Sequence, residues 1–171
     1  MNEVVAYKNS DGTYSDINSE GSSPIKKLSE DALNIMRHDM AHIMAEAVIS
    51  LFPNTKPTIG PFIKNGFYYD FDIERPLNEE DIVKIENKMK EILNQTRNFH
   101  KKSITKNEAL ELFHDNKYKL ELINSIEDAE LTIYEQENFI DLCKGPHHLS
   151  TKEYQPHFKI INISGAYWRG I

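Results

Sequence analysis

The sequence predicts an α+β fold, a two-layer sandwich in which an antiparallel sheet carries helices on one face. The first observation is that apolar residues recur at helical spacing in two long segments, one after Ser29 and one after Asn78. The second is a set of shorter apolar or alternating segments, typical of strands. The third is composition: 171 residues, 39% hydrophobic and 10% aromatic, are enough for one domain with a core.

Residues 1–28 differ in character from the rest of the chain. Residues 19–24 have a linker-like composition, and Asp11-Gly12 could turn a short hairpin with residues 4–7 as one strand. We expect a flexible N-terminal arm, or the remnant of a small N-terminal domain, with no strand of useful length. One domain should then occupy residues 29–171.

Three helices are predicted from their N-terminal signals. Ser29 is a suitable N-cap because two acidic residues follow it, and the helix should end near Pro53. A second helix should begin after Asn78, which three acidic residues follow. Thr105 and Glu108 have the spacing of a capping box and predict a third, shorter helix.

Strands are predicted in the remaining segments. Asn65-Gly66 favours a hairpin turn, and residues 67–73 then alternate between apolar and polar, as in a half-buried strand. The other predicted strands are residues 118–123, 131–134, 139–142 and 158–163. In the first of these strands, Lys119 would lie on the polar face.

Charge and cysteine content exclude several classes of protein. The formal net charge of −7 argues against a general nucleic-acid binder, although it permits a site for the end of an RNA. The single cysteine, Cys143, excludes an intramolecular disulfide and suits a reducing compartment. No apolar segment approaches the roughly 18 residues of a membrane span, so we expect a cytoplasmic protein with no membrane partner.

Two pairs of residues are the main candidates for a functional site: His38 with His42, and Cys143 with His147. Residues four apart on a helix share a face, so both imidazoles of the first pair could point to one place. Three histidines and a thiolate that converge would form either a tetrahedral metal site or a proton-transfer site. The alternative is a pair of polar histidines at the edge of the core.

The positions of several other polar residues bear on whether they belong to this site. Asp141 lies two residues before Cys143, so on a strand both would point to one side, where Asp141 could orient a histidine or remain a solvated carboxylate. Lys119 would be exposed, or, inside a cleft, would hold a carbonyl oxygen or a water. Asp39 is predicted to face away from the line that joins His38 and His42, and the histidine pair has no metalloprotease glutamate between its members. His100 and His114 are predicted to be surface residues.

Five short motifs occur at residues 37–42, 59–61, 65–70, 141–147 and 164–170. In this order and spacing they resemble the editing domain of bacterial threonyl-tRNA synthetase, over roughly residues 29–171. The resemblance implies a deacylase that hydrolyses serine wrongly attached to threonine tRNA, with the 3′ end of that tRNA as its partner. It also implies which residues line the pocket: His38, His42, Lys119, Asp141, Cys143 and His147.

By the same resemblance, Gly60 and Tyr69 would shape the pocket around the terminal adenosine. Related alanyl editing domains bind zinc through a matching set, which here would be His38, His42, Cys143 and His147. The threonyl branch is understood to hydrolyse without a metal. Zinc is therefore an option at these four residues, and no cofactor is required.

The implied activity fits a general limit on molecular recognition. Serine lacks one methyl group of threonine, and such a difference is worth only about 1–3 kcal/mol in a pocket, so a second, editing site restores accuracy. The family continues beyond the position of Ile171 into an ATP-dependent domain, so we expect no threonine activation here. The chain would act as the editing part of a threonyl-tRNA synthetase or as a free-standing trans-editing protein, with a full threonyl-tRNA synthetase as an optional partner. The alternatives are a non-catalytic zinc-binding module and an inactive synthetase remnant that modulates a partner.

Overall fold

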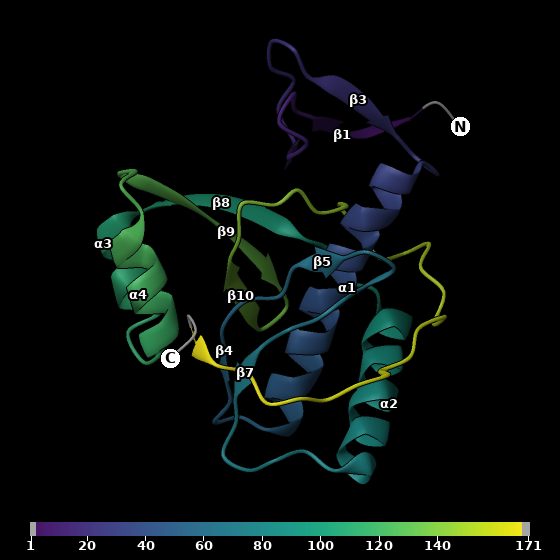
Figure 1. Ribbon diagram of the computed structural model, residues 1–171, viewed down its shortest axis with the longest axis vertical. Coiled ribbons are helices and arrows are strands. Elements are labelled where there is room, and N and C mark those ends of the chain that lie inside the picture. Colours follow the sequence, from purple (N-terminus) through teal and green to yellow (C-terminus); the bar gives the residue numbers. More distant parts are fainter. Residues whose placement is uncertain (1–2, 169–171) are drawn as a thin grey trace.

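The computed structural model describes residues 3–168 and has the α+β fold that the sequence predicted. Four helices and several small antiparallel sheets make up the described residues (Figure 1). The helices are α1 (Glu30–Leu51), α2 (Glu79–Gln95), α3 (Lys106–Leu112) and α4 (Lys117–Ser125). Within this part of the chain, none of the helices is both long enough and apolar enough to cross a membrane.

Helices α1 and α2 pack side by side and form the main core. The side chain of Ser29 accepts a hydrogen bond from the backbone N–H of Ala32, which confirms the predicted start of α1. Asn78 and Asp81 cap α2 reciprocally, as a capping box does. The buried members of this core are Met40, Ile43, Ala47, Val48, Ile85, Met89, Ile92, Leu93, Phe99 and Tyr134.

The central sheet is antiparallel and has three strands in the order β10-β9-β8. Its strands are β8 (His100–Thr105), β9 (Glu130–Gln136) and β10 (Phe139–Leu142). The sequence predicted β9 and β10 but missed β8, because β8 is mostly exposed and carries no apolar alternation. Thr105 ends β8 and caps α3, as predicted, so the sheet leads directly into the α3–α4 pair.

The N-terminal residues form a sheet of their own, in the order β2-β1-β3, above the start of α1 in Figure 1. Its strands are β1 (Val4–Lys8), β2 (Tyr14–Ser15) and β3 (Ser23–Lys26). The expected hairpin around Asp11-Gly12 is present, but the prediction that this region lacks a strand of useful length is wrong. The reason is long-range packing: Ala6 and Ile25 are buried against Ala32 and Ile35 of α1.

Two short ladders lie between α1 and α2 in sequence. Strand β4 (Lys56–Pro57) pairs with β7 (Phe71–Asp72), and β5 (Phe62–Ile63) pairs with β6 (Gly66–Phe67). Ile63 lies opposite Gly66, so the predicted hairpin is confirmed, with Asn65 in the left-handed region at φ 65°. The single alternating strand predicted over residues 67–73 is instead split between β6 and β7.

Two predicted strands are wrong. Residues 118–123 lie in α4, whose start is capped by Asn116 through the backbone N–H groups of Tyr118 and Lys119. Helical spacing buries Lys119 together with Ile123, so Lys119 is not on an exposed strand face. Residues 158–163 have no strand partner; this segment crosses in front of the molecule in Figure 1 and reaches α4, where Trp168 donates a hydrogen bond to Glu121.

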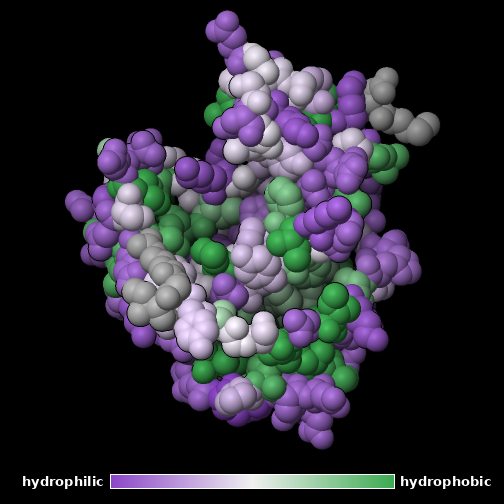
Figure 2. Space-filling view, in the orientation of Figure 1, coloured by the Kyte–Doolittle hydropathy of each residue, from purple (hydrophilic) through white to green (hydrophobic). Residues whose placement is uncertain are grey.

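On the face that Figure 2 shows, hydrophilic residues lie mostly at the top and around the edges, and green hydrophobic residues lie toward the middle and lower part. His100 and His114 are exposed, as predicted.

Candidate functional site

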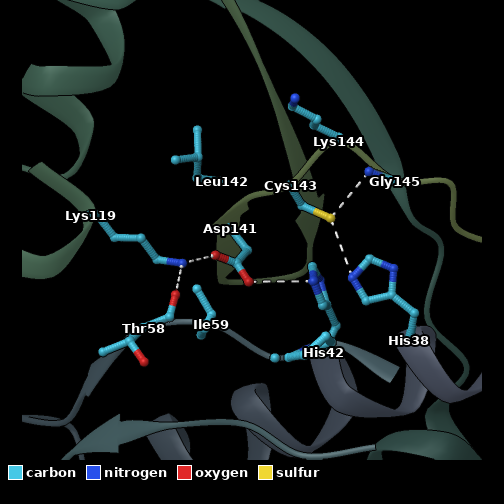
Figure 3. A pocket seen from close by; sticks show the side chains of 12 residues that line it. His38, His42, Thr58, Ile59, Lys119, Asp141, Leu142, Cys143, Lys144 and Gly145 are labelled. Carbon is cyan, nitrogen blue, oxygen red and sulfur yellow. Dashed lines mark hydrogen bonds and ion pairs between the residues drawn. The ribbon is translucent and has the colours of Figure 1, made fainter. Parts of the chain in front are cut away.

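A cavity of about 390 Å³ lies between α1, the segment before β5, α4 and the end of β10. Twelve residues line it: His38, His42, Thr58, Ile59, Gly60, Pro61, Lys119, Asp141, Leu142, Cys143, Lys144 and Gly145. Figure 3 shows Lys119 and His38 on opposite sides of the central pair Asp141 and Cys143. The cavity therefore brings together residues that are more than a hundred positions apart in the sequence.

A buried ion pair forms one side of the cavity. Lys119 Nζ donates to Asp141 Oδ1 at 2.5 Å and to the backbone oxygen of Thr58 at 2.5 Å. The other carboxylate oxygen of Asp141 accepts a hydrogen bond from the Tyr69 hydroxyl at 2.6 Å and lies 3.4 Å from His42 Nε2. Both oxygens of the Asp141 carboxylate and the Lys119 ammonium are therefore paired, as buried charges require.

A cluster of histidines around Cys143 forms the other side. Cys143 Sγ lies 3.5 Å from His38 Nε2 and 3.4 Å from His147 Nε2, and it accepts a hydrogen bond from the Gly145 N–H at 3.3 Å. One nitrogen each from His38, His42 and His147, together with this sulfur, lie within 4.8 Å of one another. The two motifs thus converge on one point.

The environment changes the protonation of this cluster. Burial would raise the pKa of Cys143, but hydrogen bonds from His147 and His38 outweigh it and lower the pKa to about 6. Burial would lower the pKa of His147, but its bonds to Asp39 and Cys143 raise it to about 9. Burial, and then the nearby cations, hold the pKa of His42 well below its ordinary value, so His42 is neutral at pH 7.

The donor set meets the requirements of a metal site. Three imidazoles and one thiolate are suitable ligands for zinc in tetrahedral geometry. The Nδ1 atom of His42 is buried and has no hydrogen-bond partner among the described residues, so this ring has an unused nitrogen inside the cluster region. His147 also bonds to a carboxylate through its second nitrogen, as metal-bound histidines commonly do. The cluster could therefore hold a metal such as zinc.

Asp39 is the residue that the sequence reasoning missed. It was predicted to face away from the histidine pair, but it is fully buried and lies 2.6 Å from His147 Nδ1. It also contacts His148 and Tyr154. No signal near Asp39 in the sequence shows this, because its partners lie more than a hundred residues away; two adjacent histidines after a Gly-Pro turn were the only available sign.

Two glycines have no room for a side chain. A Cβ at Gly60 would lie 2.0 Å from Cδ2 of Tyr69, so the cavity wall passes directly over the Tyr69 ring. Gly145 has a positive φ of 77°, and a Cβ there would lie 2.3 Å from the Tyr134 hydroxyl. Both glycines allow the backbone to approach an aromatic ring closely.

The structure brings all eight residues singled out from the sequence to one region. Five of the predicted catalytic residues and Gly60 line the cavity: His38, His42, Lys119, Asp141 and Cys143. His147 and Tyr69 are not lining residues themselves: His147 contacts Cys143, and Tyr69 lies against Gly60. The carbonyl of Thr58 was not predicted, because a backbone oxygen leaves no trace in the sequence.

Comparison with known proteins finds relatives that share one name, threonine–tRNA ligase. No family model matches the chain. A threonine–tRNA ligase of Borrelia turicatae is 55% identical over 143 residues, which are 82% of this chain and 24% of that protein. The threonine–tRNA ligase of Lawsonia intracellularis is 52% identical over 150 residues, 86% of this chain and 23% of the relative.

The threonine–tRNA ligase of Wolbachia pipientis is 44% identical over 177 aligned residues, covering 99% of this chain and 28% of the relative. The chain thus spans about a quarter of the length of these relatives, from 23% to 28%. The chain is therefore a member of the threonine–tRNA ligase family that corresponds to one segment of those proteins.

Proposed function

We propose that the cavity hydrolyses the ester bond that links serine to the terminal adenosine of threonine tRNA. The observation that carries the proposal is that one cavity has the buried Lys119–Asp141 pair on one side and a histidine–thiol cluster on the other. Membership of the threonine–tRNA ligase family supports threonine tRNA as the substrate class. Ester hydrolysis needs a water, a base to activate it and a donor for the oxyanion, and these side chains include candidates for the base and the donor.

In the proposed reaction, water attacks the ester carbonyl carbon. A new carbon–oxygen bond forms, the bond from the carbonyl carbon to the ribose oxygen breaks, and the products are free serine and tRNA. We assign His38 as the base that removes a proton from the water, because its imidazole lines the cavity. The same proton, or one from solvent, then passes to the ribose oxygen that leaves.

Lys119 is assigned the stabilisation of negative charge on the substrate. An ammonium group has three N–H donors, and the contacts with Asp141 and Thr58 use two of them. The third can donate to the carbonyl oxygen as it becomes an oxyanion. Asp141, itself bonded to Tyr69, holds the ammonium in place, and His42 is neutral, so it adds no competing positive charge.

Selectivity follows from the size of the amino acid. Serine is smaller than threonine by one methyl group, so a closely fitting site can admit serine and reject threonine by steric clash. We assign Gly60 and Tyr69 to the wall that faces the terminal adenosine, since a residue larger than glycine could not pass over this ring. The partner is then the 3′ end of a seryl threonine tRNA, presented with or without a full threonyl-tRNA synthetase, in the cytoplasm.

The direct test is a deacylation assay with Ser-tRNA(Thr) and Thr-tRNA(Thr) in parallel. We expect release of serine and near-complete retention of threonine. His38→Ala should slow serine release by about 10²-fold, the usual scale for a positioned acid–base group. His114→Ala is the matched control, because His114 is exposed and outside the cavity. Equal rates on the two substrates would refute an editing role.

The four-ligand cluster favours a second candidate, a zinc-binding module without catalysis. A structural zinc site contributes to folding and is filled stoichiometrically. Elemental analysis of protein purified without chelator distinguishes the two: one zinc per chain, with no serine release, would favour the module. A chain that has neither zinc nor activity would instead be an inactive remnant that modulates a partner synthetase.

A further inference from the structure

Asp39 lies at the centre of a buried polar network on the side of the cluster away from the cavity. Its Oδ1 atom is 2.6 Å from His147 Nδ1 and accepts a bond from the backbone N–H of His148 at 3.3 Å. Its Oδ2 atom is 2.7 Å from His148 Nδ1 and accepts a bond from the Tyr154 hydroxyl. All four donors come from residues 147–154, whereas Asp39 belongs to α1.

Asp39 is ionised in this environment. The side chain has no exposure to solvent, and burial alone would raise its pKa. Hydrogen bonds from His147 and His148 outweigh burial and lower the pKa below its ordinary value. A buried carboxylate with this many donors is stable only while the donors stay in place.

Contacts at both nitrogens fix the orientation of the His147 ring. Its Nδ1 atom bonds to Asp39, which leaves Nε2 directed at Cys143 Sγ, 3.4 Å away. Aromatic rings pack around it: Phe99 is stacked with its centroid 4.9 Å away, and Tyr134 lies edge-on at 4.5 Å. The His147 side chain is itself fully buried. Among the described residues, the Asp39 carboxylate is the hydrogen-bond partner of Nδ1 that distinguishes this orientation from the flipped one.

We propose that Asp39 is a positioning residue for the reaction in the cavity: it holds His147 with Nε2 facing Cys143, and so orders the cluster that His38 also joins. This inference rests on the proposed function, because it concerns the same site. Asp39 touches no cavity space and acts only through His147. If the cluster holds a metal, the same contact fixes the nitrogen that His147 presents to it.

The two oxygens of Asp39 allow its two roles to be separated. Of the two Asp39 oxygens, the Tyr154 hydroxyl bonds only to Oδ2, and it also lies 2.8 Å from His148 Nδ1. Tyr154→Phe therefore weakens the attachment of residues 147–154 to α1 and leaves the bond between Oδ1 and His147 intact. Asp39→Asn puts an amide where two oxygens accepted bonds, and weakens the bond to His147. A residue that only anchored the segment would give the same result in both variants.

Two measurements test the proposal on the full chain, with chelator present. The first is proton NMR of the imidazole N–H between His147 and Asp39, which a short bond to a carboxylate shifts far downfield and burial protects from exchange; His147→Gln identifies it. We expect the resonance in the wild type and in Tyr154→Phe, and its loss or upfield movement in Asp39→Asn. The second is deacylation of Ser-tRNA(Thr), where Asp39→Asn should lower kcat by about 10–100-fold with little change in KM.

Several results would overturn the inference. A wild-type protein without the downfield resonance lacks the proposed bond, whether or not Asp39→Asn folds. Asp39→Asn and Tyr154→Phe with equal kcat would mean that Asp39 only anchors the segment. A wild-type protein that shows the resonance but releases no serine would refute the proposed function, and the loss of the resonance in Asp39→Asn would still establish that Asp39 orients His147.

Discussion

Lys119 Nζ lies 2.5 Å from Asp141 Oδ1 in the interior of the protein, where the two side chains are only 2% and 4% exposed. The pair joins α4 to β10, because Lys119 lies in α4 and Asp141 lies in β10, 22 residues later in the sequence. Burying either charge alone would be costly, so each side chain compensates for the desolvation of the other. The pair therefore serves stability as well as any role in chemistry.

The first prediction concerns this ion pair. Lys119→Ala leaves the Asp141 carboxylate buried without its cation, and breaking a buried pair in this way costs about 3–5 kcal/mol. We expect urea denaturation to show a loss of that size. Serine release from Ser-tRNA(Thr) should also slow by at least about 10²-fold.

A double variant separates stability from chemistry. Lys119→Met with Asp141→Asn removes both charges together, so most of the lost stability should return while serine release stays slow. Lys102→Ala is the control for loss of a lysine, because Lys102 forms an exposed pair with Glu135. A folded and fully active Lys119→Ala variant would remove Lys119 from the mechanism.

The second prediction concerns the close approach of Gly60 to Tyr69. In Gly60→Ala, the new methyl group would be 2.0 Å from the Tyr69 ring, so the ring or the cavity wall must move. Overpacking of this kind costs about 1–3 kcal/mol, and we expect a larger KM for Ser-tRNA(Thr) as well. Gly66→Ala is the matched control, because the nearest atom to its added Cβ is 4.0 Å away. Equal KM values for the two variants would contradict the assignment of Gly60 to the wall.

The parts of the fold that the sequence predicted are those with strong local signals. Ser29, Asn78 and Thr105 each cap a helix with the side chain that the sequence offered. The convergence of His38, His42, Cys143 and His147 was a long-range expectation, and it came from motif spacing and family resemblance. Local chemistry therefore gave the starts of α1, α2 and α3 but not that of α4, and the motifs gave a candidate site.

Most of the parts that the sequence did not predict depend on partners far away in the chain. The α4 segment alternates like a strand, but Asn116 caps it as a helix, and Lys119 is drawn into the core by Asp141. The β8 strand is polar, and its ladder with β9 is what makes it a strand. Asp39 is buried only because the segment that carries His147 folds over α1. Local periodicity contains none of this information.

The third prediction reverses an expectation from the sequence about residues 1–28. Ile25 is buried against α1, and Tyr14 stacks on Phe62 beside the cavity wall with ring centroids 5.6 Å apart. Ile25→Ala should therefore lower the free energy of unfolding by about 2–5 kcal/mol. Ile17→Ala is the control, because Ile17 is 63% exposed in the same region. Thermal melts of equal Tm for the two variants would mean that the N-terminal sheet is dispensable.

The fourth prediction concerns the thiol of Cys143. Hydrogen bonds from His147 and His38 outweigh burial and place its pKa at about 6, so in metal-free protein the thiolate predominates above about pH 6. The rate of alkylation by iodoacetamide should level off above that pH and fall as the pH decreases below it. The same cysteine in urea-unfolded protein is the control and should titrate near pH 8.5, the ordinary value. A folded-state midpoint near 8.5 would contradict the hydrogen-bonded arrangement.

The last prediction concerns the metal that the His38, His42, Cys143 and His147 cluster could hold. The residues assigned to water activation and to the oxyanion, His38 and Lys119, can act through a proton and a fixed charge without an ion. We therefore expect serine release to continue after chelation that elemental analysis shows to be complete. Readdition of zinc serves as the control, and it should not increase the rate. Activity that is abolished by chelation and restored by zinc would instead give the metal a direct role, and His147→Ala should then lose zinc and activity together.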